Sequence, residues 1–374
     1  MFSFKAILRN DMQIQPAYPT INELQAYPAG KPLEEFKREY GIEDVIKLAS
    51  NENPLGCSSH VTLAIVQELA QLARYPDSNA HNIKQALSEF HDLPIEYFTI
   101  GNGSEELINL ITRCFVSSND AVVFGQYSFI AYPLVTAAQG ATKIEVPAKN
   151  YGIDLDAMLD AIKTNEEKVK VVFIANPNNP TGTILTKEQI HNFLQKVPPS
   201  VLVVLDEAYV DYDTSADAQE FVQQFDNVIV LRTFSKAYGL AGVRIGYAIA
   251  NPEINDIFNR VRQPFNVNCV AQAAAVAAIT DRDFVNTVKT TTADKRKWFY
   301  KQFDALGLNY VKSHTNFILV QIDNASDINQ KLLEQGIIIR PMDEYGLDNW
   351  IRVSMGTEVE NIRFIDSLKD LLSA

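Results

Sequence analysis

Four short apolar runs lie in the middle of the chain, and each is continuous rather than alternating with polar residues. They are AVVF at 121–124, VKVVFIA at 169–175, VLVVL at 201–205 and VIVLRTF at 228–234. Runs of this kind are typical of strands buried on both faces, as in parallel sheets covered by helices. Amphipathic stretches lie before and between them, at 104–116, 154–162 and 186–196. The order strand, helix, strand predicts an α/β fold with right-handed crossovers.

The pattern changes after about residue 255. A long helical region is followed by apolar runs at 316–322, 336–342 and 349–355 and by a terminal helix. This predicts a smaller α+β domain, formed by the C-terminal part together with the N-terminal segment. At 374 residues, two or three domains are expected. We predict an N-terminal arm at 1–59, a large domain with a mostly parallel sheet between helices at 60–255, and a small domain at 256–374.

The composition narrows the classes of partner. The net charge of -13 disfavours nucleic acid or an anionic membrane, but a local group of arginines can still bind a small anion. The three cysteines form no CxxC pair, no apolar run approaches a membrane span, and the N-terminus lacks a signal-peptide pattern. We therefore expect a cytoplasmic protein. We expect no metal site, because no metal-ligand spacing connects His60, His81, His91, His191 and His314.

The strongest chemical signal is RTFSKAYGLAGVRIGY at 232–247, which follows an apolar run. Lys236 stands at the predicted strand end, where partial dehydration lowers the pKa of an amine and frees it to form an imine. The Ser235 hydroxyl and the Arg244 guanidinium can both reach one phosphate. An isolated lysine here would be read as a solvated turn residue. The combination favours a functional site.

A second signal is VLVVLDEAY at 201–209. Asp206 ends the apolar run, where a carboxylate can pair with a pyridinium nitrogen. Tyr209, three residues on, can donate to a phenolic oxygen of the same ring. Asp206 could instead cap a following helix. Both signals fall at the carboxyl ends of strands, where ligands bind in open α/β sheets.

Weaker signals accompany these two. In GNGSEE (101–106) the glycines allow close backbone approach and the amides of a helix start can bind an anion, but Asn102 and Glu105 could also form a capping box. The loop NPNNPTG (176–182) could present an asparagine amide to a ring oxygen or be only a turn. Tyr127 could stack on a ring or belong to the core.

Two arginines, Arg340 and Arg352, interrupt apolar runs near the C-terminus. A charge in such a place is usually paired or binds an anion. A structural salt bridge is the alternative for either one.

Together and in this order, these motifs resemble the fold-type I PLP-dependent (class II) aminotransferases, and within them the histidinol-phosphate aminotransferases. The resemblance covers most of the chain. It runs through LASNENPLG (48–56), RYPD (74–77), GNGSEE, NPNNPTG, DEAY (206–209), TFSKAYGLAGVRIGY (233–247) and IRVSMGT (351–357).

The resemblance implies a role for each matching residue. Lys236 would carry pyridoxal 5'-phosphate (PLP) and move the proton between substrate Cα and cofactor C4′, with Asp206 at the ring nitrogen. Tyr209 and Asn179 would contact the ring oxygen, and Tyr127 would stack on the ring. The implied contacts to the cofactor phosphate are Gly103, Ser104, Glu105, Ser235 and Arg244.

The resemblance also implies a homodimer, in which Tyr75 of RYPD reaches the neighbour's site. Arg352 would bind the substrate phosphate or the acceptor carboxylate, with Arg340 as a second anion contact and Asn51 also binding substrate. The implied reaction transfers an amino group from L-histidinol phosphate to 2-oxoglutarate in histidine biosynthesis, giving imidazole-acetol phosphate and glutamate.

Two other functions remain open, and a third, from a different class, is disfavoured. An aromatic amino acid aminotransferase shares this architecture. A PLP-dependent decarboxylase of a phosphorylated amino acid is also compatible, because the cofactor motifs do not decide which bond at Cα breaks. A non-catalytic binding protein would be expected to have lost Lys236 or Asp206, and the chain keeps both.

Overall fold

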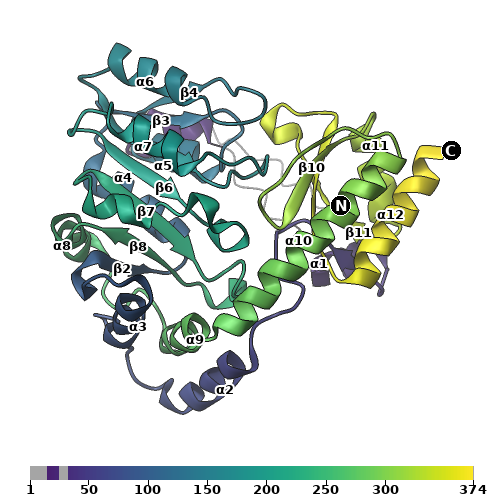
Figure 1. Cartoon of the computed structure of the whole chain (residues 1–374), viewed down its shortest axis with the longest axis horizontal. Coiled ribbons are helices and arrows are strands. Elements are labelled where there is room, and N and C mark those ends of the chain that lie inside the picture. The colour runs from purple at the N-terminus through teal and green to yellow at the C-terminus, as the bar shows by residue number, and fades with distance from the viewer. Residues whose placement is uncertain (1–14, 25–32, 374) are drawn as a thin grey trace.

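The computed structural model describes residues 15–24 and 33–373, and the rest of the predicted arm, 1–14 and 25–32, lies outside the described residues. Figure 1 shows a large sheet with its helices beside a smaller sheet. The large sheet has seven strands in the order β2-β8-β7-β6-β5-β3-β4, and β8 alone runs antiparallel to its neighbours. The strands are β2 (Phe98–Gly101), β3 (Ala121–Gly125), β4 (Thr142–Val146), β5 (Val169–Ala175), β6 (Leu202–Asp206), β7 (Val228–Thr233) and β8 (Gly246–Ala250).

The mostly parallel sheet is therefore confirmed, and the four apolar runs are β3, β5, β6 and β7. Their side chains alternate between two apolar clusters: Val203 and Leu205 belong to one, and Val204 to the other. Helices cover both faces. The helices that contribute to the first cluster are α2 (Ser59–Glu68), α3 (His81–His91), α6 (Leu155–Thr164), α7 (Lys187–Leu194) and α9 (Cys269–Thr280). The helices that contribute to the second cluster are α4 (Ser104–Phe115), α5 (Ala131–Ala138) and α8 (Pro252–Val261).

The smaller α+β unit is also confirmed. Its antiparallel sheet has the order β12-β13-β10-β9. The N-terminal segment joins the same unit through β1, which pairs in parallel with β11 in a separate two-stranded sheet. The strands are β1 (Ile46–Lys47), β9 (Tyr310–Val311), β10 (Phe317–Gln321), β11 (Ile337–Ile338), β12 (Arg340–Pro341) and β13 (Trp350–Ser354). The helices are α1 (Leu33–Tyr40), α10 (Arg282–Ala305), α11 (Ala325–Glu334) and α12 (Glu358–Ser373).

Single turns of 3-10 helix complete the described elements. They are η1 (Pro19–Glu23), η2 (Leu69–Gln71), η3 (Ile95–Tyr97), η4 (Val210–Tyr212), η5 (Thr214–Ala216), η6 (Gln219–Gln223), η7 (Ala241–Val243) and η8 (Asp343–Tyr345). The boundary proposed after residue 255 stays a prediction, and α9 on its far side packs on α2 and α3 of the large unit. Within the described ranges, no helix is long and apolar enough to cross a membrane.

Candidate active site

A cavity of about 250 Å³ lies where the carboxyl ends of β5, β6 and β7 meet the start of α4 and the small sheet. Ala175, Asp206 and Thr233, the last residues of the three strands, all line it. Most of the residues singled out from the sequence line it too, although they come from distant parts of the chain. These are Asn51, Ser104, Glu105, Asn179, Asp206, Tyr209, Ser235, Lys236, Arg244, Arg340 and Arg352.

Lys236 follows β7 and reaches into this cavity. Its Nζ donates a 3.1 Å hydrogen bond to the carbonyl of Ser50 and lies 5.7 Å from the ring centre of Tyr209. Loss of water around the amine lowers the pKa of Lys236 to about 8, and the positive charge of Arg352 contributes to the shift. A lysine in this state supplies a neutral amine near physiological pH, as a nucleophile must.

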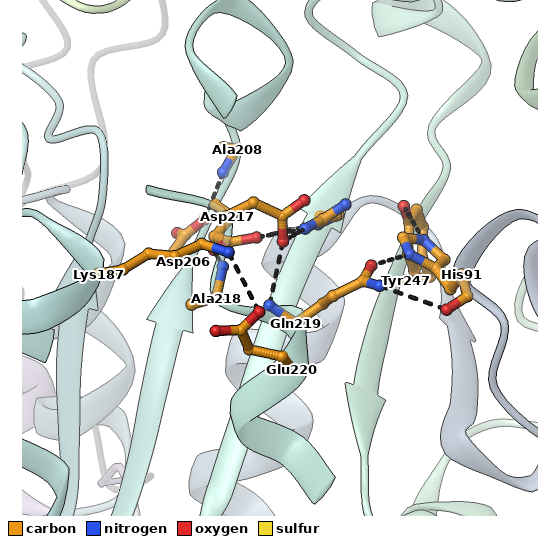
Figure 2. Close-up of polar contacts among 11 residues, drawn as sticks. His91, Lys187, Asp206, Ala208, Asp217, Ala218, Gln219, Glu220 and Tyr247 are labelled. Carbon is orange, nitrogen blue, oxygen red and sulfur yellow. Dashed lines mark hydrogen bonds and ion pairs between the residues drawn. The ribbon is translucent and has the colours of Figure 1, made fainter. Parts of the chain in front are cut away.

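Asp206 is buried at the end of β6, with two donors on its carboxylate. The Tyr132 hydroxyl donates to Oδ2 at 2.8 Å, and the Ala208 amide donates to Oδ1 at 3.2 Å; Figure 2 labels Asp206 beside Ala208. Burial raises the pKa of Asp206, whereas both hydrogen bonds lower it. A cation opposite this carboxylate would be paired in a site of low polarity, where charge attraction is strong.

The Tyr209 hydroxyl is held by Asn51. The Asn51 amide donates to it at 2.9 Å, and Ser354 of β13 donates to Asn51 Oδ1 at 2.8 Å. All three residues are buried. Asn51 thus connects the large unit, the N-terminal segment and the small sheet, and it fixes the direction in which the Tyr209 hydroxyl points.

The N-terminus of α4 forms one wall of the cavity. Gly103 precedes the helix with a φ of 83°, and no side chain among the described residues caps the helix. A Cβ at Gly103 would lie 2.5 Å from Nη2 of Arg244, so glycine lets the guanidinium lie against this turn. Uncapped amides beside an arginine suit an anion such as a phosphate.

The alternative of a capping box at this helix is wrong. Asn102 and Glu105 do not cap α4. The backbone N–H of Asn102 instead donates to the side-chain carboxylate of Glu106. The helix start therefore keeps its amide donors for another partner.

The two arginines from the small sheet differ in their partners. Arg352 donates to Asn179 Oδ1 at 2.5 Å and to the Ala49 carbonyl at 2.8 Å, both of which are neutral acceptors. Arg340 forms an ion pair of 2.7 Å with Glu344. Both arginines line the cavity, Arg352 with hydrogen bonds to the loop after β5 and to the N-terminal segment, and Arg340 with an ion pair inside the small unit.

Tyr127 lies elsewhere than predicted. It packs outside the cavity in an apolar cluster with Tyr151, Trp350 and Met342. Its backbone has a φ of 54°, which turns the chain after β3 and brings Phe129 to the cavity wall instead. The aromatic residues that line the cavity are Phe129, Tyr209 and Tyr345.

Tyr75 also lies away from the cavity of its own chain. It is 83% exposed, and its ring stacks on Phe265 at 4.7 Å between ring centres.

Comparisons with known proteins agree with the geometry of this site. The family model for aminotransferase class I and II matches residues 43–368. Histidinol-phosphate aminotransferase 1 of Psychrobacter arcticus is 50% identical over 379 aligned positions, which cover 100% of both chains. The chain belongs to the histidinol-phosphate aminotransferase family. Histidinol-phosphate aminotransferase 2 of Pasteurella multocida is 47% identical, over 94% of this chain and 97% of that one.

A solved structure of this family extends the likeness to three dimensions. The histidinol-phosphate aminotransferase from Sinorhizobium meliloti, crystallised in complex with pyridoxal-5'-phosphate, superposes with a TM-score of 0.88 at 30% identity. The match covers 97% of this chain and 99% of that one. The α/β architecture around the cavity is thus that of the histidinol-phosphate aminotransferase family.

Two residues of the candidate site were not found from the sequence: Phe129, which lines the cavity, and Tyr132, which donates to Asp206 behind the cavity wall. Phe129 was missed because the turn at Tyr127 has no clear sequence signal. Tyr132 was missed because it lies within an apolar stretch of α5, although a buried tyrosine hydroxyl usually has a hydrogen-bond partner.

Proposed function

We propose that this protein transfers the amino group of L-histidinol phosphate to 2-oxoglutarate, giving imidazole-acetol phosphate and glutamate, in histidine biosynthesis. One observation carries the proposal. A lysine with a lowered pKa, a buried carboxylate, an uncapped helix start and an arginine all line one cavity. Full-length similarity to histidinol-phosphate aminotransferases supports it.

The residues present fit PLP. The amides of α4, Ser235 and Arg244 offer donors to a phosphate at one wall, and Asp206 offers a carboxylate to a ring nitrogen. Tyr209 and Asn179 stand where they can contact a ring oxygen, and Phe129 offers a face for stacking. When bound, PLP supplies an aldehyde for attachment to Lys236 and an electron-accepting ring.

Lys236 has two roles in this proposal. Its amine holds the cofactor before substrate enters, and the same Nζ then moves the proton between the substrate Cα and C4′ of the cofactor. Asp206 keeps the ring nitrogen protonated, so that negative charge developing at Cα is stabilised during proton removal. Tyr209, oriented by Asn51, donates to the ring oxygen.

The anionic groups of both substrates would use the arginines. Arg352 binds the phosphate of histidinol phosphate in one half-reaction and a carboxylate of 2-oxoglutarate in the other. Arg340 is close enough to the same cavity to help with the more highly charged phosphate.

A second candidate is supported by the apolar part of the wall. Phe129, Ile130, Leu134 and Tyr345 line the cavity and could surround the ring of an aromatic amino acid. The deciding experiment measures kcat/KM for histidinol phosphate, phenylalanine and tyrosine with one preparation and 2-oxoglutarate as acceptor. We expect the highest value for histidinol phosphate, and a value for phenylalanine that equals it would favour the aromatic enzyme.

The proposed working unit is a homodimer in the cytoplasm. Exposed apolar side chains are frequent in the segment that leads to Tyr75: Leu63 and Val66 of α2, and Leu69 and Leu72 just after it; Phe265 is also exposed and stacks on the Tyr75 ring. Such a group of exposed apolar residues is typical of a protein interface. In this proposal, Tyr75 completes the neighbour's phosphate site.

A further inference from the structure

A buried ion pair lies directly behind the proposed site, on the opposite side of the strands. Glu207 follows Asp206 at the end of β6, and Arg232 lies in β7; their side chains are 1% and 6% exposed. Both Nε and Nη2 of Arg232 donate to Glu207 Oε2, at 2.9 and 2.7 Å. Neither residue lines the cavity.

Strand alternation relates this pair to the cavity. Successive side chains of a strand point to opposite faces. Asp206 and Thr233 line the cavity, so their chain neighbours Glu207 and Arg232 point away from it. Each member of the ion pair is thus bonded through the backbone to a cavity residue.

The pair also lies where backbone pairing between the two strands ends. The last residues in register are Asp206 and Leu231, and the Glu207 amide donates to the Leu231 carbonyl at 2.8 Å. Beyond that point, the segment after β6 leads to Tyr209, and the segment after β7 leads to Lys236. The ion pair extends the connection between the strands by one more position, next to the segments that carry these residues.

Two further groups hold the pair in place: the buried Ala218 amide and the partly exposed carboxylate of Asp217. The Ala218 amide donates to Glu207 Oε1 at 2.6 Å, and Arg232 Nη2 donates to Asp217 at 2.5 Å. Figure 2 shows Asp217 and Ala218 beside the strand end that carries Asp206, with Gln219 reaching toward His91. The carboxylate and the guanidinium therefore have little freedom to move.

Stability alone does not explain such a pair. Removing two charges from water costs about as much as their attraction returns, and apolar residues of similar volume often replace a buried pair without loss of stability. What apolar residues cannot reproduce is the fixed geometry of a two-pronged hydrogen bond from a planar guanidinium.

We propose that Glu207 and Arg232 are positioning residues for amino transfer, because they set the spacing between Asp206 on β6 and Lys236 after β7. This inference rests on the proposed function. Asp206 must contact the nitrogen of the bound ring, and the Lys236 amine must reach the opposite side of the same ring. A small change in the separation of Asp206 and Lys236 therefore misaligns one of them. Misplacement on the order of 1 Å can cost roughly 100-fold in rate.

The test compares Glu207→Gln with Asp217→Asn in the holoenzyme. Both variants remove one negative charge from the same guanidinium, but only Glu207→Gln weakens the link between β6 and β7. We expect Glu207→Gln to move the pH midpoint of the bound cofactor's visible absorbance by about half a unit or more. We also expect kcat to fall roughly tenfold or more with little change in KM, and Asp217→Asn to do neither.

A charge-neutral double variant, Glu207→Leu with Arg232→Met, separates positioning from folding. We expect it to unfold at a temperature near that of the wild type while its absorbance midpoint and kcat change as in Glu207→Gln. This variant also serves if Glu207→Gln fails to fold. The inference is overturned if the double variant matches the wild type, or if the two single variants behave alike. If the wild type itself carries no cofactor on Lys236, the proposed function has failed instead.

Discussion

The hydroxyl of Tyr132 donates a 2.8 Å hydrogen bond to the carboxylate of Asp206, and both side chains are buried. Because this bond lowers the pKa of Asp206 while burial raises it, Tyr132→Phe should make the charged carboxylate less stable. A hydrogen bond to a charged group contributes about 1.5–3 kcal/mol, so we expect kcat to fall roughly tenfold or more. Steady-state kinetics with histidinol phosphate measures this.

Tyr212→Phe is the matched control for that variant. The Tyr212 hydroxyl is buried but has no hydrogen-bond partner within the described part of the chain. Removing it should leave kcat near the wild-type value. Equal losses in the two variants would argue against a specific role for the Tyr132 hydroxyl.

Removal of the Asp206 carboxylate itself should have a much larger effect. We expect Asp206→Ala to lower kcat far more than it weakens PLP binding, because the carboxylate acts on charge that develops in the transition state. Equilibrium titration with PLP gives the affinity and single-turnover kinetics gives the rate. A variant with a near-normal rate would refute the role assigned to Asp206.

The lowered pKa of Lys236 predicts how cofactor attachment depends on pH. Below about 8 the amine is mostly protonated and cannot attack an aldehyde, so the rate of PLP attachment to the apoprotein should rise with pH and level off above about 8. Arg352→Ala removes a nearby positive charge and should move this midpoint upward. Stopped-flow absorbance measures both, and borohydride reduction with mass spectrometry should find the cofactor on Lys236. A pH midpoint near 10 for PLP attachment would contradict the conclusion that burial lowers the pKa of Lys236.

Substrate binding should depend on the shape as well as the charge of Arg352. Arg352→Ala should raise KM for both histidinol phosphate and 2-oxoglutarate by roughly 10- to 100-fold, from charged hydrogen bonds of about 1.5–3 kcal/mol. Arg352→Lys should restore binding only in part, since an ammonium lacks the planar fork. Arg260→Ala, an exposed arginine on α8, is the control. Unchanged KM for both substrates would exclude Arg352 as the anion site.

The exposed face of α2 predicts the oligomeric state. Leu63 and Val66 are each 58% exposed, so aspartate at both positions should be tolerated within one chain but not inside an apolar interface. We expect this double variant to sediment as a monomer and to lose activity, because Tyr75 would no longer reach a neighbouring site. Val359→Asp, at a position 77% exposed on α12, should stay dimeric and active. A double variant that remains dimeric would place the interface elsewhere.

The residues at strand ends could be located from the sequence because the apolar runs have clear boundaries. Asp206 and Lys236 follow continuous apolar runs, which are typical of buried strands, and parallel strands bring their carboxyl ends to one edge. Tyr127 shows the limit of this reasoning. The same rule places it at the edge, but a left-handed backbone conformation turns its ring away and presents Phe129.

Contacts between the two units could not be predicted in this way. Arg352 and Asn179 are 173 residues apart, and their hydrogen bond depends on how the small sheet docks against the loop after β5. The Asn51 bridge from Tyr209 to Ser354 depends on the same docking. A single sequence gives the strands of each unit but not the relative orientation of two packed units.

The pairing of β1 with β11 affects how the chain can fold during synthesis. Ile46 is synthesised before the strands of the large sheet, which all lie between residues 98 and 250, but its partner Ile337 is synthesised after them. The large sheet can therefore form while β1 still lacks its partner strand β11. Domains generally fold as units as they emerge, so Asn51 reaches its place against Ser354 only after β13 has been synthesised. The active site is thus completed only after the large sheet, and a chain cut short before β13 would retain that sheet but lack Arg352 and Ser354.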